Sequence, residues 1–246
     1  MNEEKQHGMV EVPEGVDPAE FARQNGGIHY TPVPFGPFVA HLRVPEDVLT
    51  FLKDEGKKLE EEHLIRTKLA GHLEKEHRYP DDARMKFVEM TAPIFQGYRN
   101  SHLEYFGLHR RIKEEGHDIK DFEPQLYLET LWINYMREGE YNPPHIHSGH
   151  LSFVIYLDIP DMKEELEAHI ANSPPPGSIQ FTNELTGNEH TWKVTQHHLN
   201  PVAGEMVIFP AALHHVVFPY KTPGTRVSVS GNILYTNIDK WPKYFF

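Results

Sequence analysis

Two histidines two positions apart, His145 and His147, are the side chains best placed to do chemistry in this sequence. They follow a rigid Pro143-Pro144 step and precede an apolar segment at 151–157. Because side chains on a strand alternate between its two faces, histidines at i and i+2 at a strand end point to the same side of the sheet. One metal ion could therefore meet both imidazoles, and the pair predicts a metal site with a further ligand from elsewhere in the chain.

A second histidine pair, His214-His215, follows an apolar segment between two turns at 201–210. Further along, Arg226 and Ser228 alternate with apolar residues, so they share one face of a predicted strand. An arginine that faces the interior of a β-structure is costly unless it meets an anion, and its planar fork suits a carboxylate. These residues predict a pocket for a metal ion and a carboxylate ligand.

Several questions stay open on residue types alone. Imidazole ligands with open coordination positions suit iron, copper, nickel or zinc. The alternative is that His145 and His147 are loop histidines and that Arg226 pairs with one of the many acidic side chains. Asn134 shares a predicted strand face with Trp132 and Met136, and we place it in the same pocket.

The composition narrows the class of protein. The chain of 246 residues has no cysteine, which excludes disulfides, thiolate metal sites and cysteine nucleophiles. Its formal net charge of −12 argues against a general nucleic-acid or membrane-surface partner, because like charges repel. It contains no apolar segment long enough to span a bilayer, and residues 1–5 do not resemble a signal peptide. We expect a cytoplasmic protein.

The first half of the chain predicts supporting helices. Residues 1–44 are rich in Pro and Gly and read as an arm over the domain, with a short edge strand at 38–43. A charged helix is expected from Pro45 to His77, with acidic residues in its first turn. The segment 79–82 predicts a stop and an N-cap, followed by a long amphipathic helix over 83–108.

The second half predicts strands. Besides the strands that flank His145 and His147, short β-type segments occur at 178–182, 191–196, 205–209, 216–220 and 226–235, with a helical insert at 162–171. No repeated helices provide parallel crossovers, so the fold class is α+β with an antiparallel, jelly-roll-like core. We expect residues 1–125 to be an arm and supporting helices packed on the core, and residues 126–246 to be the catalytic core of a single structural domain.

Two ordered sets of residues carry a resemblance to a known family. The first includes Gly139, His145, His147 and Tyr156, and the second includes the Gly204-to-Pro210 segment with His215 and Arg226 after it. Together they resemble the 2-oxoglutarate/Fe(II)-dependent dioxygenases. The resemblance is strongest to the oxygenase branch related to prolyl hydroxylases, of phage and marine bacterial type, over residues 126–237. The resemblance implies a double-stranded β-helix core, Fe(II) as metal and 2-oxoglutarate as co-substrate.

The resemblance also implies roles for individual residues. His145 would be the first iron ligand and His215, which fits the family's spacing better than His214, the distal one. Arg226 would bind the far carboxylate of 2-oxoglutarate, with Tyr156 and Ser228 as hydrogen-bond partners. Two further sequence readings remain for these partners: a core aromatic for Tyr156 and a plain strand residue for Ser228.

The sequence departs from the family's usual pattern at the second ligand. A carboxylate is usual two residues after the first histidine, but this chain has His147 there. Three histidines would leave the Fe(II) centre more positive. Either His147 is the third ligand, or another group such as His150 or Asp158 completes the set. Parity along a regular strand favours His147 over His150.

The function that follows is an oxygenase that uses dioxygen to hydroxylate a small-molecule or peptide substrate, with release of succinate and carbon dioxide. Two alternatives stay open. One is a cupin-like dioxygenase with three histidines and no 2-oxoglutarate, and it gives Arg226 no role. The other is a noncatalytic metal-binding module on the same fold.

Overall fold

The computed structural model describes residues 36–59, 73–183, 195–236, 238 and 241, and residues 36–246 form one compact unit. Most of the arm expected over 1–44 therefore lies outside the described residues. Among the described residues, no helix is long and apolar enough to cross a membrane. The cytoplasmic location stays a prediction.

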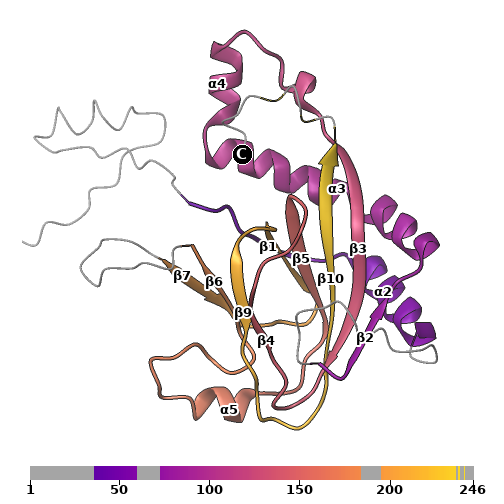
Figure 1. Ribbon diagram of the computed structural model, residues 1–246, viewed down its shortest axis with the longest axis vertical. Coiled ribbons are helices and arrows are strands. Elements are labelled where there is room, and N and C mark those ends of the chain that lie inside the picture. The colour runs from indigo at the N-terminus through magenta and orange to yellow at the C-terminus, as the bar shows by residue number, and fades with distance from the viewer. Residues whose placement is uncertain (1–35, 60–72, 184–194, 237, 239–240, 242–246) are drawn as a thin grey trace, which may run out of the picture. The chain divides into compact units, whose positions relative to one another are not determined.

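The larger sheet is antiparallel throughout. Within the described residues its strands follow the order β1-β8-β5-β10-β3-β2. Strand β10 is long and lies between β3 and β5 at the centre of this sheet (Figure 1). The strands are β1 (Ala40–Arg43), β2 (Lys75–Arg78), β3 (Gln125–Met136), β5 (Leu151–Asp158), β8 (Glu205–Pro210) and β10 (Arg226–Thr236).

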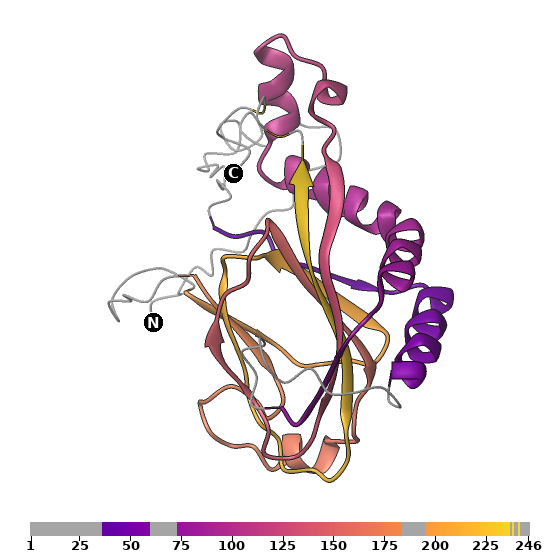
Figure 2. The same ribbon diagram turned by 45° about the vertical axis from the view of Figure 1, so that its right-hand side comes forward.

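A smaller antiparallel sheet faces it, in the order β4-β9-β6-β7 (Figure 2). Its strands are β4 (Asn142–His145), β6 (Ile179–Thr182), β7 (Gln196–Leu199) and β9 (His214–Val217). From β3 to β10 the chain passes back and forth between the two sheets, which is the connectivity of a jelly roll. Within the described residues the outermost strands of the two sheets do not pair with each other, so the sheets form an open sandwich rather than a closed barrel, and the expected α+β jelly roll is confirmed.

Helices cover the outer face of the larger sheet. Helices α2 (Glu46–Leu59) and α3 (Asp81–Tyr105) lie outside the strands in both ribbon views (Figures 1 and 2). Phe87 of α3 stacks on Phe153 of β5 with ring centroids 5.5 Å apart, and both side chains are fully buried. Burial of each such side chain contributes roughly 1.5–3 kcal/mol. This cluster fixes the outer face of the sheet, so the opposite face is left for the site.

Three shorter helical elements complete the described part. Helix α4 (Leu108–Glu114) and the 3₁₀ turn η1 (Ile119–Phe122) bury a small cluster of their own around Ile112. Helix α5 (Lys163–Glu167) lies inside the expected insert at 162–171. The predicted helix over 83–108 is therefore α3 followed by the start of α4.

The segment that was expected to end the first helix is instead a strand. Residues 75–78 form β2, which pairs with β3 through Glu76↔Asn134 and His77↔Ile133. The ring of His77 meets Tyr135 edge-on at 6.1 Å. The helix propensity of these residues is overridden, because the edge of β3 offers backbone hydrogen bonds and an apolar surface to pack on. The rest of the predicted helix, beyond Leu59, lies outside the described residues.

Other predicted boundaries shift by a few residues. The N-cap expected within 79–82 is Pro80, which offers no side-chain hydrogen bond. Strand β9 begins at His214, not at 216, so the histidine pair is part of the strand. Strand β7 covers 196–199, whereas residues 191–194 of the predicted strand lie outside the described part.

Candidate metal centre

Three histidine side chains converge between the two sheets. His145 ends β4, His147 lies just beyond it, and His215 lies on β9, which is the neighbour of β4 in the smaller sheet (Figure 1). One ring nitrogen from each histidine lies within 4.8 Å of the others. The ring centroids are 4.2 Å apart for His145 and His215, 4.8 Å for His145 and His147, and 5.0 Å for His147 and His215. This spacing suits three ligands of one ion.

Backbone carbonyls orient two of the rings. Nδ1 of His145 lies 2.6 Å from the carbonyl oxygen of Pro143, and Nδ1 of His215 lies 2.9 Å from that of Leu213. A proton on Nδ1 can be donated to each carbonyl, which leaves the Nε2 lone pair for a metal. His147 is held through its backbone, because its N–H donates to the carbonyl of Ala211 at 2.9 Å.

Burial keeps the three imidazoles in the neutral form that binds metals. It lowers the pKa of His215 to about 3 and that of His147 to about 4, and it also lowers the pKa of His145. In His215 and His147, proximity to His145 lowers the pKa further. Protons therefore do not compete for these nitrogens near pH 7.

Arg226 is buried at the start of β10, with 4% of the residue exposed. One guanidinium nitrogen donates to the carbonyl of Gly177 at 2.8 Å, and the other lies against the sulfur of Met136. Its Nε is buried without a hydrogen-bond partner among the described residues. The guanidinium carbon lies 5.9 Å from the ring centre of Tyr156. A buried cation with an unused donor is suited to an anionic ligand.

Polar side chains form a row across the inner face of the larger sheet. Ser228 pairs with Asn134 on one side and with Tyr156 on the other, and all three residues are buried. The Nδ2 group of Asn134 donates to Ser230 at 3.4 Å, a long hydrogen bond. Burial raises the pKa of Tyr156, so its hydroxyl stays protonated and can donate.

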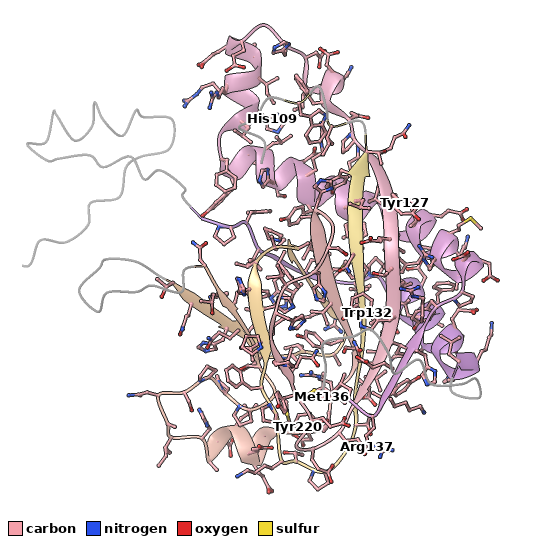
Figure 3. All side chains as sticks on the ribbon, in the orientation of Figure 1. His109, Tyr127, Trp132, Met136, Arg137 and Tyr220 are labelled. Carbon is pink, nitrogen blue, oxygen red and sulfur yellow. The ribbon has the colours of Figure 1, made fainter. Side chains whose placement is uncertain are left out.

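All the site residues expected from the sequence line one pocket between the sheets. Figure 3 labels Trp132, which lines this pocket, and Met136 further along β3, whose carbonyl accepts a hydrogen bond from Tyr220. The lining includes His145, His147, His215, Arg226, Tyr156, Ser228 and Asn134. The side chains that strand alternation assigned to the pocket and those that the family resemblance added, His215 and Tyr156, therefore lie in the same pocket.

The other candidates for a third ligand lie elsewhere. His150 accepts a hydrogen bond from the backbone N–H of Tyr235 at 2.9 Å through Nδ1. Asp158 is exposed at the end of β5. Within the described residues, the group with metal-ligand spacing is His145, His147 and His215.

Sequence reasoning missed other residues of the pocket. Asn142 on β4 contributes an Oδ1 atom that is buried without a hydrogen-bond partner among the described residues. Leu73 and Phe209 contribute apolar walls. Strand parity did not indicate Asn142, because the register of β4 against β9 shifts between Asn142 and His145. The sequence feature that could have identified Asn142 as a pocket residue is its position directly before the Pro143-Pro144 step.

The residues present fit an imidazole-bound metal with an anionic co-ligand. Three neutral nitrogen donors suit a first-row transition metal, and they leave its positive charge uncompensated by protein. The buried guanidinium of Arg226 supplies a second positive group in the same pocket. Both features favour a small dicarboxylate over a neutral ligand.

A comparison with protein-family models agrees with this interpretation of the pocket. The model of a family described as putative 2OG-Fe(II) oxygenase matches residues 130–232, less than half of the chain. Comparison with curated proteins gives no match.

Solved structures show distant similarity. A prolyl-4-hydroxylase from Pseudomonas putida is 14% identical with a TM-score of 0.49, covering 78% of this chain and 90% of that one. HygX from Streptomyces hygroscopicus, with nickel and 2-oxoglutarate bound, is 12% identical with a TM-score of 0.44, covering 84% and 85%. A prolyl hydroxylase from Trichoplax adhaerens, in complex with a hypoxia inducible factor peptide fragment, is 11% identical with a TM-score of 0.47, covering 81% and 83%.

At these identities and TM-scores, the assignment rests on the family match. The matched segment extends from Thr130 within β3 to Asn232 within β10, and it contains the three histidines and Arg226. Residues 130–232, with the candidate metal centre inside them, are therefore similar to a family described as putative 2OG-Fe(II) oxygenase, a description that names Fe(II) and 2-oxoglutarate.

Proposed function

We propose that this chain hydroxylates a small-molecule or peptide substrate, with 2-oxoglutarate converted to succinate and carbon dioxide. The observation that carries the proposal is the convergence of three imidazoles within 4.8 Å in the pocket that also holds the buried guanidinium of Arg226. The overall reaction adds one oxygen atom of dioxygen to the substrate and the other to succinate.

In this proposal His145, His147 and His215 hold the iron. When bound, Fe(II) and 2-oxoglutarate supply the activation of dioxygen, coupled to oxidative decarboxylation. The protein's part is ligation, orientation and exclusion of water. Three neutral ligands leave charge compensation to the dianionic co-substrate, in contrast to the commoner set of two histidines and one carboxylate.

Arg226 binds the far carboxylate of 2-oxoglutarate in this assignment. Its guanidinium is buried and already oriented by the carbonyl of Gly177, so little side-chain entropy is lost when the anion binds. Tyr156 and Ser228 donate through their hydroxyls. Asn134 donates through the Nδ2 hydrogen that does not point to Ser230.

The division of the chain is part of the proposal. Every residue assigned above to iron or 2-oxoglutarate lies in 126–246, the proposed catalytic core. In residues 36–125, the helices α2 and α3 pack on the outer face of the larger sheet, which accords with a supporting role.

The test is Fe(II)-dependent formation of succinate from 2-oxoglutarate by the purified full chain. We expect the parent protein to form succinate and the His145→Ala protein to form none. Dioxygen uptake that does not need 2-oxoglutarate would favour the cupin-like alternative. Iron binding without either activity would favour the noncatalytic module.

A further inference from the structure

One side of the pocket carries oxygen acceptors that lack donors. The Oδ1 atoms of Asn134 and Asn142 are both buried without a hydrogen-bond partner among the described residues. Both residues line the pocket, from β3 of the larger sheet and β4 of the smaller one. An unpaired buried acceptor costs roughly 1–3 kcal/mol, which a ligand that donates hydrogen bonds can offset.

A buried carboxyl group lies beside them. Glu76 is 8% exposed and pairs directly with Asn134 across β2 and β3. Residues that pair in this way share a face of the sheet, with Cβ atoms roughly 4.5–5.5 Å apart. The row on the inner face is therefore Glu76, Asn134, Ser228 and Tyr156, and Glu76 is its member at the sheet edge.

The other residues of β2 confirm this orientation. Lys75 lies over the ring of Tyr135, and the hydroxyl of Tyr135 donates to Gly56 of α2, so both face the helices. Alternation along β2 then directs Glu76 to the opposite side, toward the pocket. Leu73, just before β2, lines the pocket and carries it toward this edge.

The carboxyl group of Glu76 has neither a hydrogen bond nor an ion pair with any described residue. Arg78, two positions along the same face, makes no ion pair with it within the described part. The charged group that influences it is Glu140, which has the same sign. Burial, and then Glu140, raise the pKa of Glu76 to about 7, as expected for a carboxyl group without a cation.

We propose that Glu76, Asn134 and Asn142 form a subsite for a positively charged nitrogen group of the substrate, an ammonium or a guanidinium. One carboxylate and two amide oxygens offer a set of acceptors for a cation, since Asn134 and Asn142 line the pocket and Glu76 pairs with Asn134 from β2. Arg226 pairs with Met136 beside this row, and Asn134 would serve both ligands, donating through Nδ2 to the anion and accepting through Oδ1 from the cation. The inference rests on the proposed function and names the substrate class for the same pocket.

The same acceptors also disfavour an anionic group of the substrate. A carboxylate or phosphate at this edge would meet three oxygen acceptors and the negative charge of Glu140, and like charges in a partly buried site repel. A neutral alcohol could donate one hydrogen bond, whereas an ammonium group donates three and a guanidinium five. The subsite therefore prefers a cation to a neutral group of the same shape.

The experiment compares matched cationic and neutral probes. Binding of butylguanidinium against butylurea, and of pentylammonium against pentan-1-ol, is measured by NMR titration on the full chain at pH 8, where Glu76 is ionised. We expect each cation to bind about tenfold more tightly than its neutral counterpart, the range of one charge-assisted hydrogen bond. Equal binding of cation and neutral probe would overturn the subsite.

Two variants locate the effect. Glu76→Gln keeps the shape and is expected to remove most of the tenfold preference, while Asn142→Ala reduces it less. The matched control is Glu74→Gln, because Glu74 lies two residues away and forms an exposed ion pair with Arg137. The Glu76→Gln protein could keep the preference for cations and melt at a lower temperature than the parent. That result would mean that the carboxyl group only holds the Asn134 amide in place, and it would overturn the proposal.

The experiments distinguish a failure of the cation subsite from a failure of the proposed oxygenase reaction. The probes are titrated both with the metal-free protein and with protein loaded with Zn(II) and 2-oxoglutarate, so the cation preference is measured without turnover. Succinate formation without a cation preference would sink the subsite alone. A cation preference without succinate formation would sink the proposed reaction alone.

Discussion

His145 and His215 lie directly opposite each other on the antiparallel strands β4 and β9, with ring centroids 4.2 Å apart. The register of this strand pair therefore sets the spacing of two proposed ligands. A slip by one residue would present His214, whose side chain points to the exposed face. The metal centre depends on strand pairing as much as on the histidines themselves.

Replacement of either of these histidines should remove bound iron. In His145→Ala and His215→Ala we expect loss of iron stoichiometry with the fold retained, because each removes one nitrogen of a three-nitrogen set. Metal content after anaerobic loading with Fe(II) is the measurement, and circular dichroism checks the fold. Unchanged stoichiometry in both variants would refute the ligand assignment.

His147 and His150 give a matched pair of variants. His147→Ala should weaken iron binding, since its ring nitrogen lies within 4.8 Å of the other two. His150→Ala should leave iron binding unchanged, because its Nδ1 accepts a hydrogen bond from Tyr235. His147→Asp restores the commoner carboxylate and should still bind iron. Loss of iron in the His150 variant alone would show that the third ligand is His150.

Arg226→Ala should weaken 2-oxoglutarate binding far more than iron binding. A charge-assisted contact of about 1.5–3 kcal/mol corresponds to a loss of roughly tenfold to a hundredfold in affinity. Titration of 2-oxoglutarate into the anaerobic Fe(II) protein measures it, with Arg110→Ala on exposed α4 as the control. An affinity equal to the parent's would place the carboxylate elsewhere.

Glu76 should make stability depend on pH. Its pKa is raised from 4.5 to about 7 in the folded state, so the folded protein binds more protons than the unfolded chain between these values. This contribution is present below pH 4.5 and is lost as pH rises through 7. Relative to the parent, Glu76→Gln should therefore gain about 1–3 kcal/mol in unfolding free energy between pH 4.5 and pH 8.

Urea unfolding of the metal-free parent and variant at both pH values measures this difference. The control is Glu74→Gln, which removes an exposed carboxyl group two residues away. A Glu76→Gln effect that is the same at pH 4.5 and pH 8 would mean that the carboxyl group is not destabilised by burial.

Gly149 connects the metal centre to β5. It has a φ of +94°, and a Cβ atom there would lie 2.8 Å from the carbonyl oxygen of Ile233. Gly149→Ala should cost roughly 1–3 kcal/mol and also weaken iron binding, since His147 is two residues away. Gly139→Ala, at φ +79° in open space, is the control for the φ cost alone. Equal costs in the two variants would exclude a role for the close approach to Ile233.

The parts of the site that follow a strict period were predictable from sequence. Arg226 and Ser228 on β10 alternate with residues that pack on the helices, such as Val229, and that alternation assigns their face. The order of His145, His147 and His215 within apolar segments carried the metal prediction.

What could not be predicted depends on pairing with distant residues. The segment Lys75–Arg78 is charged and follows a helical pattern, so nothing local indicates a strand, and the role of Glu76 arises only because β3 lies beside it. Asn142 is placed by an irregular register between β4 and β9. Local propensity is a weak guide where tertiary contacts decide the conformation.

Strand β10 is the last of the described strands in sequence and yet occupies the middle of the larger sheet, where Asn134 and Ser230 meet from positions 96 residues apart. The entropy of closing such long loops is lost before any pairing energy is gained, so we expect slow refolding. Until β10 inserts, β3 and β5 expose unpaired edges that favour aggregation. Insertion also delivers Arg226, so the capacity to bind an anion should appear only in the last step of folding.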